Sequence, residues 1–337
     1  MLLDPRDLWP RFRVESAVAM AMSSQLENAP TLRHSMDTLL RHHVRAVEAT
    51  VAVHSTRAPR SLLQSVMAHA HEVHVRLVQP SPTAPTNRPI LGWASSLTRQ
   101  ITKLAIPASV VRDSTEWTIL LAQLSSLNEL EVSFDGSERS TALEEVLKAL
   151  ATSSRISSFH CTCPSTQSTK FAITPSMLQD MMQWLSQPYV RSFGFSHWSF
   201  ERVEESVPQF YQAILATTSM TEVAIAHSRL PQLHKTFENR ENSRPFNIPS
   251  IAFMDCMLTS RDIEALACGL RLSTSVRALK LSNNPSLEPV AVLALAQALP
   301  TTQLSSLTLS DVPLSDAALS ALCAGVAATP SLRHFVL

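Results

Sequence analysis

The fold is decided by residues 276–309, which read VRALKLSNNPSLEPVAVLALAQALPTTQLSSLTL. This stretch begins and ends with one template of three apolar positions, first as Val276-x-x-Leu279-x-Leu281 and then as Leu304-x-x-Leu307-x-Leu309. Between the two copies, apolar residues recur three and four positions apart, namely Val292, Leu295 and Leu299. That spacing places them on one face of a helix. One unit is therefore a short strand, a turn and an amphipathic helix.

The template continues on both sides of this stretch. Further copies start at Met220, Ile248 and Leu332, so five copies follow one another at intervals of 28 residues. With 45% of the residues apolar, five such matches in one register arise by chance about 2 times in 1,000. Looser copies start at Val190, Ile156, Leu127 and Ile101, a weaker one starts at Ala70, and a doubtful one covers Val51 and Val53. The chain is therefore a repeat protein.

Helical apolar faces recur in the second half of the other units. They consist of Leu143, Leu147 and Leu150; Leu178, Met181, Met182 and Leu185; Ile263, Leu266 and Leu270; and Leu319, Leu322 and Val326. A single unit cannot bury both its strand and its helix, so neighbouring units must stack. The sequence predicts an α/β horseshoe, a solenoid with a parallel sheet on the concave side and helices on the outside.

The repeat resembles a known family. Leu279-x-Leu281-x-x-Asn284, followed by the Ala- and Leu-rich residues 290–299, is similar to a leucine-rich repeat of the ribonuclease-inhibitor type. The copies of the template amount to about nine to eleven such units, and the resemblance implies that they bind proteins on the concave face. Other units replace the family's asparagine with Cys256, Val312, Ser228, Trp198, Pro164 and Asp135. We therefore expect an irregular horseshoe.

The first residues carry a second resemblance. Leu8-Trp9-Pro10-Arg11-Phe12-Arg13-Val14 is similar to the closing LWxxLxL of an F-box, a helical module that docks substrate receptors onto cullin-type ubiquitin ligases. The resemblance implies adaptor docking through Leu8, Trp9, Phe12 and Val14. The two helices that precede this motif in an F-box are absent, so the match is a truncation, a relic or a coincidence.

The chain divides into two expected parts. Residues 15–45 have the apolar spacing of two amphipathic helices, which a solenoid needs to cap its first strand. We expect a helical cap with a possible F-box tail at residues 1–45 and the solenoid at 46–337, most regular from 220 onward. Residues 332–337 form a last strand with no helix after it, so either the chain is truncated there or the edge binds another chain, including a second copy.

The composition excludes several classes of site. Lys+Arg and Asp+Glu balance at 28 each, and the basic residues are scattered, so we expect no nucleic-acid or membrane binding. The five glycines, Gly92, Gly136, Gly194, Gly269 and Gly325, are far apart. Neither a phosphate-binding loop nor a GxSxG nucleophile elbow can be written. We therefore expect no cofactor and no enzyme.

Cysteine usage and hydropathy favour the cytoplasm, with the nucleus also open. Five cysteines are too few and too odd in number for a disulfide framework. The first 16 residues, MLLDPRDLWPRFRVES, place acids and prolines where a secretion signal needs basic and apolar runs. No stretch approaches the roughly 20 apolar residues that span a bilayer.

Two histidine-containing stretches are weak metal candidates. In His160-Cys161-Thr162-Cys163, strand alternation turns Cys161 into the core and His160 to the concave face. We therefore expect a structural cysteine. His69, His71 and His74 also fall on different faces, so we expect solvated or cap histidines and no metal site.

The concave face supplies the candidate binding residues. Most positions that flank the apolar template are small, and the charged or larger ones are Glu129, Glu131, Arg191, Glu222, Arg277, Lys280 and Arg333. The polar insertions at 78–90, 161–170 and 234–247 are either spacers or binding loops. We expect a non-catalytic protein-binding scaffold, with the substrate-recognition part of an F-box-type ubiquitin ligase receptor as its sharper form. The alternative is a GTPase regulator or enzyme inhibitor that grips one globular partner.

Overall fold

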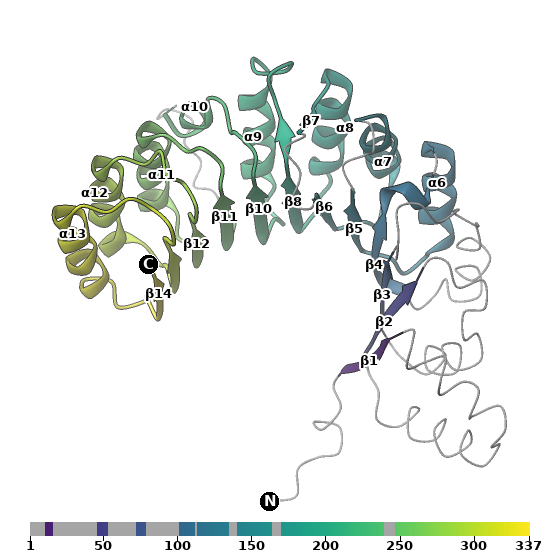
Figure 1. The fold of residues 1–337 in the computed structure, drawn as a ribbon, viewed down its shortest axis with the longest axis horizontal. Helices are drawn as coiled ribbons and strands as arrows, with labels where there is room; N and C mark the ends of the chain where they lie inside the picture. Colours follow the sequence, from purple (N-terminus) through teal and green to yellow (C-terminus); the bar gives the residue numbers. More distant parts are fainter. Residues whose placement is uncertain are drawn as a thin grey trace, which may run out of the picture. The chain divides into compact units, whose positions relative to one another are not determined.

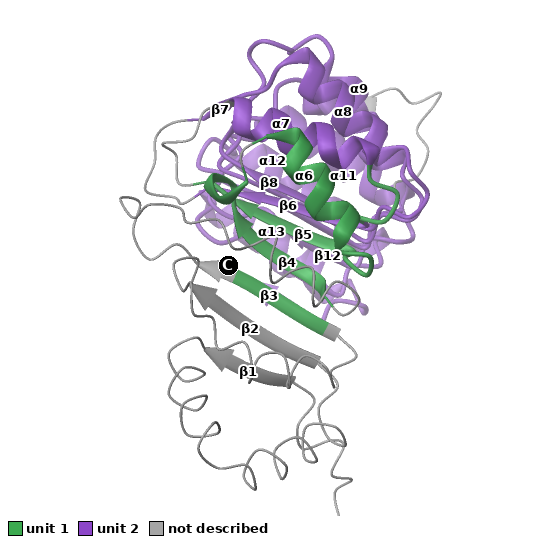
Figure 2. Ribbon diagram, turned by 90° about the vertical axis from the view of Figure 1, so that its right-hand side faces the viewer, with its two compact units in different colours: residues 1–138, 153–156 green, residues 139–152, 157–337 purple. Residues whose placement is uncertain are grey.

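The computed structural model describes residues 11–15, 46–52, 72–78, 101–111, 113–134, 140–163, 170–238 and 247–337. Labels follow Figure 1. The chain divides into two compact units, which Figure 2 distinguishes by colour. Unit 1 comprises residues 1–138 and 153–156, and unit 2 comprises residues 139–152 and 157–337.

Unit 1 is built on parallel strands that pair in chain order. They are β1 (Arg11–Glu15), β2 (Ala46–Ala52), β3 (Glu72–Val78), β4 (Ile101–Pro107) and β5 (Glu129–Ser133). After β4 come a short 3-10 helix, η1 (Ala108–Val110), and then α6 (Ser114–Gln123). β1 lies within residues 1–45, for which a helical cap was expected. The remainder of that range, including the two expected helices, lies outside the described residues.

The core of unit 1 follows the apolar template. Ile101, Leu104 and Ile106 of β4 are each at most 2% exposed, as are Leu130 and Val132 of β5. α6 begins where the Asp113 side chain accepts a hydrogen bond from the Glu116 backbone N–H at 2.9 Å, which satisfies one of the donors that a helix start leaves open. The helix then buries Trp117, Leu120 and Leu121.

Unit 2 is an arc in which strands line the inner side and helices the outer side (Figure 1). Its main sheet contains β6 (Ser158–Thr162), β8 (Ser192–Ser196), β10 (Glu222–Ala226), β11 (Ser250–Met254), β12 (Ala278–Lys280), β13 (Ser306–Thr308) and β14 (His334–Val336), all parallel and in that order. A small second sheet pairs β7 (Phe171–Ala172) with β9 (Trp198–Ser199). Every strand of the main sheet therefore lies beside those of the adjacent repeats.

The helices of unit 2 alternate with these strands. They are α7 (Ser140–Thr152), α8 (Pro175–Leu185), α9 (Val207–Ala216), α10 (Leu233–Glu238), α11 (Ser260–Leu272), α12 (Pro289–Ala298) and α13 (Asp316–Ala327), with the 3-10 helix η3 (Leu299–Thr301) after α12. Most of the predicted apolar helix positions are buried, but Leu319 is 38% exposed and Val326 is half-buried. Among the described helices α13 packs chiefly on α12, so only part of its apolar face is covered.

The interior of unit 2 is centred on aromatic rings. The ring of Phe195 stacks on that of Trp198 with centroids 4.2 Å apart. Phe193 makes edge contacts with Trp198 at 6.2 Å and with Phe210 at 6.0 Å. These are favourable geometries for aromatic pairs. Trp198 occupies the position that corresponds to Asn284 in a later repeat, so an aromatic ring fills this turn of the solenoid.

The asparagine position is polar in three other repeats. Asn284 is fully buried and accepts hydrogen bonds from the backbone N–H groups of Cys256 at 3.1 Å and Leu258 at 3.3 Å. One repeat earlier, the Cys256 thiol donates to the carbonyl oxygen of Ile225 at 3.3 Å. In the repeat before that, the Ser228 hydroxyl accepts from the backbone N–H of Trp198 at 2.9 Å. Smaller polar side chains thus replace part of the asparagine ladder, and the 28-residue register continues.

Candidate functional site

The outward side chains of neighbouring strands in unit 2 align in two rows, which we call the concave face. The strand pairing places in the first row Ser158, Ser192, Glu222, Ser250, Ala278, Ser306 and His334. The second row contains His160, Gly194, Ala224, Ala252, Lys280, Thr308 and Val336. The predicted alternation of β6 is confirmed, since Cys161 is fully buried and His160 is half-buried.

A hydrogen-bonded chain crosses three strands of the concave face. The Nε2 atom of His160 lies 2.8 Å from the Ser192 hydroxyl. That hydroxyl lies 3.5 Å from Oε2 of Glu222, to which it can donate. In a hydrolase triad the carboxylate holds the imidazole, which in turn activates the serine. Here the carboxylate contacts the serine, and Ser192 is only 8% exposed. In this arrangement Ser192 can act as a hydrogen-bond donor to Glu222, and it is poorly arranged to act as a nucleophile.

Gly194 makes room for this chain. A Cβ atom at this position would collide with Nδ1 of His160 and lie 3.1 Å from the carbonyl oxygen of Ala224. Glycine inside a strand lowers stability, and it often marks a close approach. At this position it lets the imidazole lie across β8.

The outward face of unit 1 carries charges that neutralise one another. Lys103 Nζ lies 3.1 Å from a carboxylate oxygen of Glu129, and Arg76 Nη2 lies 4.0 Å from one of Glu131. The side chains of Lys103 and Glu129 are 39% and 45% exposed. Ion pairs this exposed contribute little to stability. Both acidic residues predicted in β5 therefore already have a cation partner within unit 1.

The other predicted binding residues fall into two groups. Glu222 and Lys280 lie on the concave face and are exposed. Arg191, Arg277 and Arg333 immediately precede β8, β12 and the segment of β14, and they are exposed. The Arg277 guanidinium donates to the carbonyl oxygens of Thr274 at 2.8 Å and Gln303 at 3.4 Å, so it ties the turns before two strands together.

The predicted docking residues and the three histidines His69, His71 and His74 lie only partly within the described residues. Phe12 and Val14 belong to β1, and Leu8 and Trp9 lie outside the described residues. His69 and His71 also lie outside the described residues, whereas His74 is half-buried in β3. In the described part of the chain, no three His, Cys, Asp or Glu side chains form a group that could hold a metal ion.

A row of residues that the sequence reasoning did not single out follows the strands of unit 2. Each has a positive φ, and the row consists of His197 (φ 62), His227 (φ 50), Asp255 (φ 53), Asn283 (φ 55) and Asp311 (φ 57). Histidine, asparagine and aspartate tolerate this left-handed conformation better than most residues. From His227 onward the spacing is 28, so aligning the repeats could have revealed the row.

Two imidazoles and a carboxylate meet in this row. The rings of His197 and His227 are stacked with centroids 4.6 Å apart. Nδ1 of His227 lies 2.7 Å from Oδ2 of Asp255. Burial lowers the pKa of His197, His227 and Lys170 lower it further, and Asp255 opposes the shift. The neutral form of His197 is therefore favoured in the folded protein.

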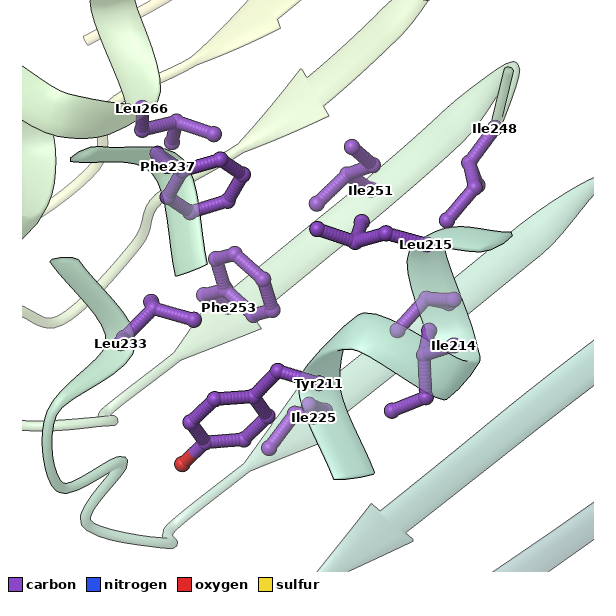
Figure 3. Close-up of a pocket in the computed structure, with 11 residues that line it drawn as sticks. Tyr211, Ile214, Leu215, Ile225, Leu233, Phe237, Ile248, Ile251, Phe253 and Leu266 are labelled. Atoms are coloured by element: carbon purple, nitrogen blue, oxygen red, sulfur yellow. The ribbon is translucent and has the colours of Figure 1, made fainter. Parts of the chain in front are cut away.

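An apolar cavity of about 20 Å³ lies behind the sheet, between β10, β11 and the adjoining helices (Figure 3). Its walls include Tyr211, Ile225, Phe237, Ile251 and Phe253. Among the described residues, α10 has 6, fewer than α9 with 10 or α11 with 13. A space this small has room for one water at most, and a water needs polar partners. We interpret the cavity as a packing gap and not as a ligand site.

Comparisons with known proteins bear on the fold. No protein-family model matches the chain, and no curated protein matches it. Among solved structures, the chain is similar to the leucine-rich repeat-containing protein LegL7 from Legionella pneumophila, with 15% sequence identity and a TM-score of 0.51. The match covers 86% of this chain and 90% of that one. The predicted α/β leucine-rich-repeat solenoid is confirmed. Separately, no helix among the described residues is long and apolar enough to cross a membrane.

Proposed function

We propose that the chain is a non-catalytic scaffold that binds a protein partner on the concave face. The supporting observation is Glu222, an exposed carboxylate that pairs with no cation among the described residues. Its neighbours on the face are small, namely Ser192, Ser250 and Ala224. An approaching basic side chain would therefore find room as well as a charge partner. A charge-assisted hydrogen bond contributes about 1.5–3 kcal/mol.

The hydrogen-bonded chain prepares Glu222 for this contact. The Ser192 hydroxyl lies 2.8 Å from His160 Nε2 and 3.5 Å from Glu222 Oε2, so it can donate to the carboxylate and favour one of its orientations. Side chains ordered in advance lose less entropy on binding. The same geometry argues against an enzyme, because Ser192 is only 8% exposed and its hydroxyl contacts the carboxylate as well as the imidazole.

A charge reversal would test the proposed face. Glu222→Arg should abolish recovery of the partner when the tagged full chain is purified from its own cells at physiological salt and bound proteins are identified by mass spectrometry. The matched control is Glu264→Arg, the same reversal at an exposed position of the outer helix α11. Equal recovery with wild type and both variants would overturn the assignment of the face.

The sharper proposal is that the partner is a substrate of an F-box-type ubiquitin ligase. Its support is the resemblance of residues 8–14 to the end of an F-box, with docking of a cullin-ligase adaptor through Leu8, Trp9, Phe12 and Val14. It also takes the repeats to be of the ribonuclease-inhibitor type. The same purification should then recover the adaptor, and alanine at those four positions should remove the adaptor while the concave-face partner is retained. Failure to recover an adaptor would count against this proposal alone.

The alternative is a GTPase regulator or enzyme inhibitor that grips one globular partner. Its support is the set of exposed basic residues beside the concave face: Arg191, Arg277, Lys280 and Arg333. Lys280→Glu should weaken binding of such a partner, and recovery of one stoichiometric protein without ligase components would favour it. We place all of these activities in the cytoplasm, with the nucleus also open.

Self-association is a separate proposal. β14 pairs with β13, and Val336 and Leu337 are 50% and 49% exposed. Strand edges with apolar side chains invite pairing with another chain. Light scattering should show an oligomer whose mass falls for Val336→Lys, and a concentration-independent monomer would exclude this mode.

A further inference from the structure

We infer that His197, His227 and Asp255 form a proton-sensitive row that keeps β7 on β9 near neutral pH and releases it in mild acid. This inference concerns the edge of the sheet at the ends of β8, β10 and β11. It does not depend on the proposed binding of a protein to the concave face.

The backbone holds the three residues in register. The backbone N–H of His197 donates to the carbonyl oxygen of Ala226 at 3.1 Å, and that of His227 donates to Met254 at 2.9 Å. These bonds continue the ladder of the sheet one residue beyond each strand. The stacked imidazoles, with ring planes 29° apart, therefore project from adjacent, hydrogen-bonded positions of the backbone.

His197 is poorly placed to carry a proton. It is 5% exposed, and its Nδ1 atom is buried without a hydrogen-bond partner. A protonated imidazole donates from both ring nitrogens, so Nδ1–H would have no acceptor. A buried donor without a partner costs free energy, and an added charge costs more. The neutral ring is therefore part of the folded arrangement.

The charges around His197 oppose its protonation on balance. His227 stacks on it from the end of β10, and Lys170 approaches from the residue before β7. The negative charge of Asp255 favours protonation of His197, but this carboxylate is already paired with Nδ1 of His227 at 2.7 Å. Burial, His227 and Lys170 all lower the pKa of His197, and Asp255 alone raises it. A proton on His197 would therefore add a buried charge whose nearest carboxylate, that of Asp255, is already shared with His227.

The same residue holds the small second sheet. The Phe171 N–H donates to the carbonyl oxygen of His197 at 2.7 Å, and the Ile173 N–H donates to that of Ser199 at 2.9 Å. Lys170 directly precedes Phe171. Repulsion between Lys170 and a protonated His197 thus acts on the residue next to the first of these bonds. Opening of β7 relieves the repulsion without breaking the main sheet.

A proton is a better ligand for this row than a metal ion. Imidazoles stacked face to face do not aim their nitrogens at one point. In addition, the His227 nitrogen nearest the carboxylate is already engaged with Asp255. Histidine titrates in the physiological range, so the row needs no further component to respond to pH.

The test combines histidine titration with amide exchange in the full chain. NMR should show His197 titrating below the ordinary histidine pKa of about 6.5. After correction for intrinsic rates, protection of the Phe171 and Ile173 amides should fall at least about tenfold between about pH 7 and pH 5. His334→Gln should behave like wild type. His197→Gln should remove the pH dependence, since the glutamine amide stays neutral.

A second variant keeps the inference testable if His197→Gln does not fold. His227→Gln removes one of the neighbouring cations, so the titration of His197 and the loss of protection should move together to a different pH. The inference is overturned if protection of Phe171 and Ile173 does not change with pH in wild type. It is also overturned if the change is the same in His197→Gln, or if exchange does not follow the titration of His197 in His227→Gln.

Discussion

The two units link their neighbouring repeats by different polar contacts. In unit 1 the contacts between strands that involve charges are exposed, as in the Lys103–Glu129 pair. In unit 2 several polar contacts between repeats are uncharged and buried, as with Asn284 and the N–H groups of the preceding repeat. Removing one partner of a buried polar contact leaves the other buried without a hydrogen bond. Such a loss costs much more free energy than the loss of an exposed ion pair. We therefore expect unit 2 to depend on single polar residues far more than unit 1.

The largest expected effect is that of Asn284→Ala. The side-chain amide donates to the carbonyl oxygens of Phe253, Leu281 and Ser282 at 3.0–3.2 Å, besides accepting the two N–H groups named above. Alanine leaves several buried backbone groups unpaired, so the free energy of unfolding should fall by about 4 kcal/mol. Urea denaturation would measure this. Asn283→Gly, at the exposed neighbouring position with φ 55, should change it by less than about 1 kcal/mol.

Next in size is Gly194→Ala, which tests the close approach on the concave face. The added methyl group collides with the His160 imidazole, so the free energy of unfolding should fall by about 2 kcal/mol. Adding His160→Ala should recover most of that loss, because the obstructing ring is then gone. If the double variant is as unstable as the sum of the single variants, the ring does not set the requirement for glycine.

A smaller effect should appear as a pH dependence of stability. The pKa of His197 is lowered in the folded state, so the unfolded chain binds more protons at pH values between that lowered pKa and about 6.5. The free energy of unfolding should therefore decrease as the pH falls through this window. Denaturation of wild type and His197→Gln at several pH values would compare them. The variant should show a shallower decrease, and equal slopes would contradict the assignment to His197.

The smallest effect is expected in unit 1. Lys103→Ala removes an ion pair whose side chains are both more than a third exposed, so the free energy of unfolding should change by less than about 0.5 kcal/mol. The change should shrink further at high salt. A loss comparable to that of Asn284→Ala would remove the contrast between the two units.

The sequence predicted the strands well because their signal is local. The template spacing identified β4, β5, β6 and β8 as well as the five regular copies, since apolar residues must alternate along a half-buried strand. The same alternation correctly predicted that Cys161 points into the core and His160 to the concave face. It did not predict β1, where Arg11–Glu15 joins the sheet, because the motif at residues 8–14 was interpreted through its resemblance to an F-box.

The sequence by itself determined that this protein is a repeat of strands and helices, because apolar periodicity depends only on residues that are close together in the chain. Which polar side chains meet was decided only by the tertiary structure. His160 and Ser192 are 32 residues apart in the sequence but are hydrogen-bonded in the structure. His197 and His227 belong to successive repeats, and their rings are stacked. One turn of the solenoid brings such residues to the roughly 4.8 Å spacing of adjacent strands. Contact then depends on register, on the glycine between them and on ring orientation, none of which is a local property of the chain.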